Sequence, residues 1–472
     1  MLFRSLRLST GLELAAGASV PVELGIAVER ITGEQGLLVR DLRARLSGRL
    51  APDGRAFTPV AIDVSAAEAR RGPLALRHLT TRSPLPALAP DISALWGGQP
   101  WSLRLHDLDR ATGGVRFEAA GGVTPDHLTF VDRVVGRTLS DQVQLASTPS
   151  LAVSGRLGPG WKPAVIEGRL EAGAVTARTV PLDGASATFL LRGSTLRFDD
   201  IVLRTRASLA RGSYEMDTSN REFRFLLEGK LQPADIAGWF RDWWPRLWST
   251  FDFTESLPSA DVDVRGRWGS PEQTTVFVAA SNGRTGLRGT TFDTARTRVF
   301  VRPQFYDVLH FHVTQKERFA RGTFARRVDL DKKDWRSMEF DAFSDLDLLE
   351  GARIIGPDII DVVAPFKFTQ PAQLRVSGRF DGPAAPGGPR RSLDLAVYSK
   401  GPFTYFEFPL SDLNAAGQVR DDDIVLDPIS VGFAGGVANG RIHLSGTGAN
   451  RRLGFDYRLS RARLGESIRS LE

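Results

Sequence analysis

Two closely spaced histidines are the residues of this sequence that come nearest to a metal site. His310 and His312 alternate with three apolar residues, Leu309, Phe311 and Val313. Side chains at positions i and i+2 of a strand point to the same face, and two histidines placed so can share a zinc ion. A zinc site needs further ligands, but no cysteine, third histidine or fixed carboxylate lies nearby in the sequence. We therefore interpret both histidines as polar-face residues of a strand and predict no metal site.

Two runs of aspartate suggest calcium as an alternative chemistry. Asp199-Asp200 and Asp421-Asp422-Asp423 are expected at matching positions of two hairpins. Carboxylate oxygens suit calcium, but neither run stands in a loop with the ligand spacing that such sites need. Aspartate is also favoured in turns, where its carboxylate accepts hydrogen bonds from the backbone. We predict that both runs form turns.

The segment from Trp239 to Trp248 is the most unusual local feature, because it contains four tryptophans. It fits a helix packed over the edge of a sheet, a lid that contacts lipid, or a contact with a membrane interface. The equivalent segment one repeat later, from Ile354 to Val363, is aliphatic, which favours packing. Pro245 and Pro357 are expected to kink or interrupt these two helices.

The composition argues against several classes of function. The chain has 472 residues, of which 42% are hydrophobic, so it can bury substantial cores. Its net charge of +6 is spread along the sequence, which does not favour nucleic-acid binding. The lack of cysteine excludes disulfides and thiolate nucleophiles, and glycine-rich phosphate loops and nucleophile elbows are also missing. We predict that the chain is not an enzyme and has no catalytic residue, no cofactor and no nucleic-acid partner.

The start of the sequence contains neither a recognisable signal peptide nor a membrane-spanning helix. The apolar stretch there, Leu12 to Val28, is interrupted by Glu13, Pro21 and Glu23. A spanning helix needs about 20 consecutive apolar residues, which this stretch does not supply. We expect any membrane anchor to lie outside this sequence.

A repeat of roughly 110 residues is the strongest signal in the sequence. Its first marker is a strand of the form Pro-x-Leu-x-Val-x-Gly. The glycine of this strand recurs at nearly equal intervals, at Gly155, Gly266 and Gly378. In a second marker, the sequence around Phe117 matches the sequence around Phe225, at almost the same interval. This match connects the N-terminal part of the chain to the later repeats.

A third marker is a series of hairpins that begin at Leu182, Phe292 and Leu410. Three later positions match in all three copies without a gap: Leu196, Tyr306 and Ile424; Ile201, Phe311 and Ile429; and the glycines Gly212, Gly322 and Gly440. A glycine at such a place fits a bulge or a close approach of two strands better than it fits a ligand site.

The repeat also predicts the domain organisation. We expect a partial repeat over residues 1–124, repeats over 125–232, 233–346 and 347–459, and the start of a further repeat over 460–472. Leu464, Ile468 and Leu471 have the spacing of one helix face, so we expect a piece of a longer protein. Pro/Gly-rich segments recur at the same position in each repeat. We therefore expect them to be loops inside the repeats, and we expect an array without a clear domain boundary.

Alternation of apolar and polar residues fills most of each repeat, as in strands that bury one face. One short helix per repeat, starting near Pro125 and Pro233, is too little to cover that face. The face could be buried in β-sandwich beads, stacked in a solenoid, or left open as a trough. A solenoid needs a far shorter period, and the lack of linkers argues against beads. We predict a mainly β fold with a continuous, curved and twisted antiparallel sheet that forms an open apolar groove.

Several motifs together resemble the AsmA-like repeat proteins of Gram-negative envelopes, which are relatives of TamB. They are the Pro-x-Leu-x-Val-x-Gly strand, the hairpin start Val180-Pro181-Leu182-Asp183 and the segment from Leu231 to Ile236, and the resemblance covers residues 100–472. It implies a long hydrophobic β-groove, an N-terminal anchor in the inner membrane, a path through the periplasm, and a role in phospholipid movement or outer-membrane biogenesis. The chain departs from the family in lacking the anchor helix and a recognisable C-terminal membrane-docking module.

The groove and the resemblance together predict the function. Exposing an acyl chain to water costs about 0.8 kcal/mol per CH₂, and an apolar trough removes most of that cost. We expect a segment of a periplasmic, bridge-like protein that binds phospholipid and conducts it between the inner and outer membranes, which it reaches through regions absent from this chain. The alternative is a non-catalytic tandem β-sandwich array with a structural or adhesive role at the cell surface. The residues predicted to line the groove are Phe189, Leu191, Leu196, Phe198, Ile201, Leu203, Phe223, Phe225, Leu227, Val299, Val301, Leu309, Phe311, Val313, Ile424, Leu426, Val431, Phe433, Leu453 and Phe455.

Overall fold

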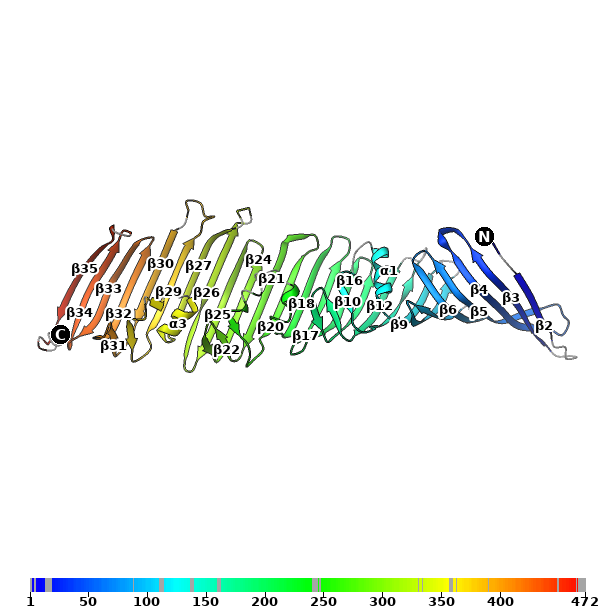
Figure 1. The fold of residues 1–472 in the computed structure, drawn as a ribbon, viewed down its shortest axis with the longest axis horizontal. Coiled ribbons are helices and arrows are strands. Elements are labelled where there is room, and N and C mark those ends of the chain that lie inside the picture. Colours follow the sequence, from blue (N-terminus) through cyan, green and yellow to red (C-terminus); the bar gives the residue numbers. More distant parts are fainter. Residues whose placement is uncertain are drawn as a thin grey trace. The chain divides into compact units, whose positions relative to one another are not determined.

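The computed structural model shows a mainly β chain in which strands account for 68% of the residues (Figure 1). It describes residues 2–3, 6–12, 19–87, 89–109, 114–135, 140–158, 163–239, 245, 248–329, 331–332, 334–355, 360–361, 363–388, 390–447, 450–463 and 465. The chain divides into two compact units. Unit 1 comprises Met1–Arg221 with Asp235–Trp239, and unit 2 comprises Glu222–Ala234 with Phe240–Glu472.

Unit 1 is built on an open antiparallel sheet in which the main strands pair in chain order, except that the short first strand pairs with the third. Two helices interrupt the series, η1 (Glu34–Gly36) and α1 (Pro125–Val135). The strands are β1 (Leu2–Phe3), β2 (Leu6–Leu12), β3 (Val20–Thr32), β4 (Leu38–Leu50), β5 (Phe57–Arg71), β6 (Leu74–Pro84), β7 (Asp91–Trp96), β8 (Gln99–Asp109), β9 (Gly114–Gly122), β11 (Ser150–Leu157), β12 (Pro163–Ala172), β15 (Gly184–Arg192), β16 (Thr195–Arg204) and β17 (Leu209–Asp217).

Unit 2 repeats this plan, with an open antiparallel sheet and the helix α3 (Leu348–Ile355). Its main strands are β18 (Glu222–Lys230), β20 (Ser259–Arg267), β21 (Ser270–Asn282), β24 (Thr294–Arg302), β25 (Phe305–Gln315), β26 (Arg318–Asp329), β27 (Asp334–Ser344), β29 (Gln373–Asp381), β30 (Arg390–Tyr398), β32 (Phe408–Arg420), β33 (Asp423–Phe433), β34 (Gly436–Ser445) and β35 (Arg452–Ser460). The predicted fold class, a long curved antiparallel sheet with few short helices, is confirmed. The main strands of neither unit form the two packed layers of a sandwich bead.

Short strands beside the main sheets recur at the hairpin starts. Unit 1 has β10 (Val143–Leu145), β13 (Val175–Ala177) and β14 (Val180–Leu182). Unit 2 has β19 (Phe251–Asp252), β22 (Thr285–Leu287) and β23 (Thr290–Phe292). Later it has β28 (Phe366–Phe368) and β31 (Pro402–Tyr405), which stay joined to the main sheet because β31 pairs with the main strand β32. Because the chain leaves the main sheet at the other short strands, those segments can be covered by a helix. Many of the buried side chains lie in the short strands, among them Val180, Phe292 and Phe403.

Helices α3 and η3 cover the short strands, whereas α1 packs on the main strands β7 and β8, where the ring centroids of Trp96 and His127 are 4.3 Å apart. In unit 2, the side chain of Thr290 donates a hydrogen bond to the carbonyl of Glu350 in α3, over 3.3 Å. In unit 1, the 3-10 helix η3 (Ala237–Trp239) packs on β14, and the indole of Trp239 donates to the carbonyl of Ala177 over 2.9 Å. Packing is therefore the role of Trp239, as the aliphatic equivalent segment suggested.

The predicted helices are only partly covered by the structure. Helix α1 begins at Pro125, as predicted, whereas Pro233 precedes turns and the short helix η3. Residues 240–244 and 246–247, with two of the tryptophans, lie outside the described residues, as do Pro357, Ile359 and Val362. The same holds for residues 464 and 466–472, where the start of a further repeat was expected.

A β-bulge recurs in the second strand of each hairpin, and it corrects two predictions. Asp199-Asp200 forms no turn, because it lies inside β16 where the pairing with β17 shifts register, and Asp200 has a φ of 50° that aspartate tolerates. The same shift occurs at Leu309-His310 in β25 and at Asp427-Pro428 in β33. The run at Asp421 does begin in the turn between β32 and β33, so the two aspartate runs do not match in position.

Candidate functional site

The strand registers of unit 2 align apolar residues into rows across the sheet. Residues directly opposite one another on paired strands share a face. One row consists of Leu227, Val262, Val278, Val299, Val308, Phe324, Phe340, Gly378, Leu393, Val419, Ile424, Leu444 and Leu453. The next consists of Gly229, Ala260, Ala280, Thr297, Phe311, Gly322, Ala342, Val376, Leu395, Gly417, Leu426, Ile442 and Phe455. Both rows cross every main strand of unit 2 without a charged residue, and we call this the apolar face of unit 2.

The apolar face is not a closed core. No residue of the first row is buried, and its side chains are half-buried against their neighbours in the sheet. Exposure rises on β35, where Leu453 is 63% and Phe455 72% exposed. A continuous apolar surface of this kind marks a binding site in a soluble protein, since water contact with it is unfavourable.

Glycines in these rows make room for aromatic rings of the adjacent strand. A Cβ atom added at Gly322 would lie 2.9 Å from the ring of Phe311, and one at Gly440 would lie 2.6 Å from the ring of Tyr457. Both glycines belong to the recurring Ala-x-Gly marker. The structure agrees with their predicted role in close strand approach.

Unit 1 has an apolar face of the same construction. One of its rows consists of Leu103, Ala119, Val153, Gly168, Phe189, Phe198 and Tyr214. The ring centroids of Phe189 and Phe198 are 5.9 Å apart, and those of Phe198 and Tyr214 are 6.2 Å apart. The aromatic side chains of this row are half-buried, so the same type of surface occurs in both units.

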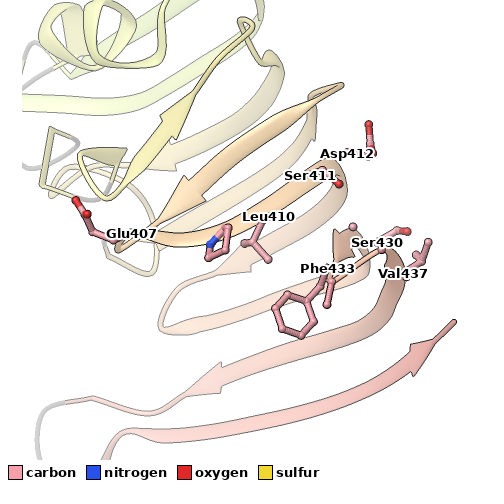
Figure 2. A pocket seen from close by; sticks show the side chains of 12 residues that line it. Glu407, Leu410, Ser411, Asp412, Ser430, Phe433 and Val437 are labelled. Atoms are coloured by element: carbon pink, nitrogen blue, oxygen red, sulfur yellow. The ribbon is translucent and has the colours of Figure 1, made fainter. Parts of the chain in front are cut away.

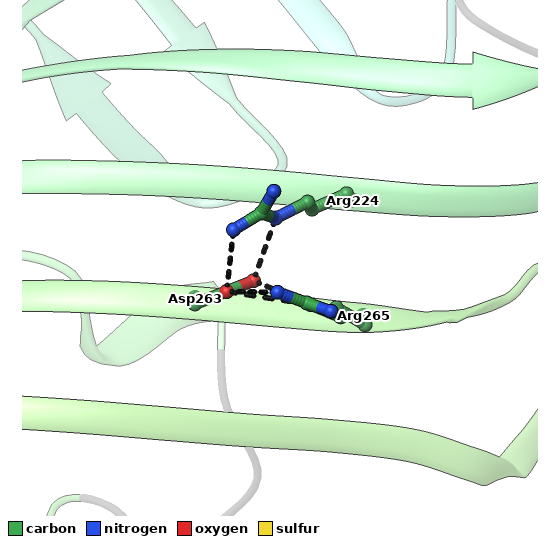
Figure 3. A network of polar contacts seen from close by, with 3 residues as sticks. All are labelled: Arg224, Asp263 and Arg265. Carbon is green, nitrogen blue, oxygen red and sulfur yellow. Dashed lines mark hydrogen bonds and ion pairs between the residues drawn. The ribbon is translucent and has the colours of Figure 1, made fainter.

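The opposite surface, which we call the outer face, carries charged residues in cross-strand pairs. Asp263 on β20 accepts hydrogen bonds from Arg224 on β18 and from Arg265 on its own strand (Figure 3). The bonds from Arg265 and Arg224 lower the pKa of Asp263 from 3.8 to about 2, so its carboxylate is ionised at neutral pH. Further pairs join Arg420 to Asp394 and other arginines to acidic neighbours along unit 2. Each strand is therefore apolar on one side and ionic on the other.

Most of the predicted groove residues lie on the apolar faces. The six in unit 1, from Phe189 to Leu203, share its apolar face because the bulge in β16 keeps Phe198 and Ile201 in phase. In unit 2 the predicted residues fall on the apolar face with one exception. Leu309 lies in the bulge of β25 opposite Thr323, apart from Phe311 and Val313, and it is 48% exposed. The extra residue of the bulge breaks the simple alternation.

Sequence reasoning left out the strands between β27 and β32. Phe340, Val376, Leu393 and Leu395 continue the rows but were not predicted to line the groove. The signal was present, since Leu393 and Leu395 alternate with polar neighbours on β30. It could have been found by applying the period-of-two test to every strand of the third repeat.

An open hollow of about 950 Å³ lies near the end of β33 in unit 2 (Figure 2). Apolar side chains such as Leu410 and Phe433 line it together with Glu407 and Asp412. A hydrogen bond from Lys367 lowers the pKa of Glu407, so this carboxyl group is poorly suited to act as a general acid. No histidine lines the hollow.

Histidines do not build a metal site in the described part of the chain. His310 and His312 stack at 6.3 Å between ring centroids, and their pairing with Arg298 and Arg296 puts both on the outer face, as predicted. No group of three histidine, cysteine or acidic residues that could hold a metal occurs in that part. His127 is buried in unit 1, where Thr124 donates to its Nδ1 atom over 2.9 Å and burial lowers its pKa.

Comparison with known proteins gave no match to any protein family, curated protein or solved structure. Every helix in the described ranges is too short or too polar to cross a membrane.

Proposed function

We propose that the chain binds phospholipid acyl chains on the apolar faces of its sheets, as a segment of a bridge-like periplasmic protein that conducts lipid between the inner and outer membranes. The observation that carries this proposal is the pair of uncharged rows that cross every main strand of unit 2. Their side chains remain half-exposed, so a ligand can reach them. A membership in the AsmA-like family would account for such a surface.

The dimensions of the apolar face suit acyl chains. Paired strands lie about 4.8 Å apart, so the first row, from Leu227 to Leu453, extends on the order of 58 Å across the strands of unit 2. The acyl chains of one membrane leaflet reach about 15 Å, half of the hydrocarbon thickness. Several lipids therefore fit side by side. Each CH₂ group buried on the rows contributes about 0.8 kcal/mol to the free energy of binding, and all positions along the rows are equivalent in this respect.

An arginine at the margin of this face favours a phospholipid over an uncharged lipid. Arg326 lies in the row beside the first one, directly opposite Tyr306 on one side and Met338 on the other. It is half-buried and makes no ion pair with any described residue. A guanidinium group in that position matches a phosphate oxygen of a headgroup whose chains lie on the apolar rows.

Lipid loading of matched variants tests this function. Ile424→Asp combined with Leu426→Asp puts two carboxylates into the two rows, whereas Val425→Asp changes the residue between them on the outer face. We expect phospholipid extracted from the purified double variant to fall several-fold below the level in the unsubstituted protein. Val425→Asp should load normally, because Val425 is 36% exposed and stands opposite Gln418 and His443. Equal loading of all three folded proteins would contradict the proposal.

A further inference from the structure

Three strands of unit 2 bring a group of basic side chains together on the outer face. Arg296 on β24, His312 on β25 and Arg321 on β26 stand opposite one another in one row. Arg298 and His310 form the adjacent pair. We call these five residues the basic patch. The sequence shows no such cluster, because the strand register alone assembles it from three successive strands.

The basic patch lacks the acidic partners that Asp263 and Asp394 supply to arginines elsewhere on the outer face of unit 2. None of its residues forms an ion pair with any described carboxylate, and its three arginines are exposed. Carboxylates on β25 and on β27 form ion pairs with arginines outside the patch. Asp307 on β25 pairs with Arg327 over 2.6 Å. Asp341 pairs with Arg375 over 3.4 Å. The patch therefore presents uncompensated positive charge to solvent.

An exposed apolar side chain stands inside the basic patch. The bulge of β25 turns Leu309 to the outer face beside His310, where it is 48% exposed. On β21, which pairs with β24, Phe277 is 39% exposed and stands opposite Phe300 on β24 and Asp263 on β20. Basic groups that surround exposed aliphatic and aromatic side chains suit a membrane interface, where charges meet headgroups and apolar tips enter the acyl boundary.

We propose that the basic patch binds the surface of an anionic phospholipid bilayer. The arginines would contact lipid phosphates, and Leu309 would insert between headgroups. Zinc does not fit this place, because the two histidines are flanked by three arginines that repel a cation. The patch lies on the opposite side of the sheet from the lipid-binding rows, so the proposal does not depend on the function proposed above.

Vesicle binding of the full chain tests the proposal. Binding to vesicles of phosphatidylcholine with phosphatidylglycerol is compared with binding to pure phosphatidylcholine vesicles. Replacing Arg296, Arg298 and Arg321 by glutamine should weaken binding to the anionic vesicles on the order of 100-fold, at about 1 kcal/mol for each arginine. Leu309→Ser should weaken binding several-fold, and that loss should persist in high salt, which screens only the charges.

The matched control is a second triple glutamine variant at Arg55, Arg77 and Arg211. These arginines are exposed and lie in unit 1, so the control has the same net charge with the patch intact. The proposal predicts that the control binds anionic vesicles like the unsubstituted protein. Equal weakening in both variants would overturn it. A patch variant that loses affinity for duplex DNA but keeps its affinity for vesicles would overturn it as well. Extracted phospholipid, measured in parallel, should stay unchanged in the patch variant.

Discussion

Replacement of Asp263 by asparagine is expected to destabilise unit 2 in a way that depends on pH. In the folded chain, hydrogen bonds from Arg265 and Arg224 lower the pKa of Asp263 from 3.8 to about 2. At about 1.4 kcal/mol per pKa unit, the full shift corresponds to roughly 2.5 kcal/mol. The two arginine side chains are 60% and 49% exposed, so screening by solvent reduces the expected loss to about 1 kcal/mol at neutral pH.

The sign of the pH dependence follows from the lowered pKa. The stabilisation is complete above the pKa of the unfolded chain, near 4, and is lost as the pH falls toward the folded value of about 2. Urea denaturation at pH 7 and at a series of pH values down to 2 measures the free energy of unfolding of unit 2. The gap between unsubstituted protein and Asp263→Asn should narrow over that range.

Asp261 supplies the control for this prediction. It lies two residues away on the same strand and outer face, is exposed, and forms no ion pair with a described residue. Asp261→Asn should change the free energy of unfolding by less than about 0.5 kcal/mol at every pH. If the two asparagine variants behave alike, the ionic pairing in Figure 3 does not stabilise the sheet, and the reasoning is refuted.

Two further predictions concern the buried side chains of the short strands and the margin of the apolar face. Phe292→Ala should destabilise unit 2 by about 3–5 kcal/mol in urea denaturation, because Phe292 is 1% exposed. Phe406→Ala, at a residue 70% exposed, should have little effect, and a similar loss in both would contradict the assignment of the core. Arg326→Met should lower the ratio of phospholipid to neutral diacylglycerol in competitive loading several-fold while the protein stays folded. An unchanged ratio would show that Arg326 does not recognise the phosphate.

The sequence predicted the main architecture because the strands keep a period of two outside their bulges. Alternation placed Phe223, Phe225 and Leu227 on one face without knowledge of their partners, since neighbouring side chains of a strand point to opposite faces. The recurring glycines also predicted the close approach of paired strands. Hairpin order and antiparallel pairing follow from short turns between such strands.

Bulges and strand register limited the prediction. The odd spacing from Leu196 to Ile201, repeated in all three hairpins, can bring both ends to one face only through an extra residue. That signal was available but was not used, and so Leu309 was assigned to the groove. The ionic pairs and the basic patch depend on which residues stand opposite each other across strands. Local patterns do not contain that information.

Lipid bound to the intact chain is the most direct test of the central claim. Native mass spectrometry of the purified, unsubstituted protein, combined with lipid extraction, measures whether phospholipid remains bound and how many molecules each chain carries. The length of the uncharged rows predicts several phospholipids per chain, removable by delipidation and restored by added phospholipid. A soluble, monodisperse protein that neither carries phospholipid nor takes it up would contradict the claim that the apolar faces bind acyl chains.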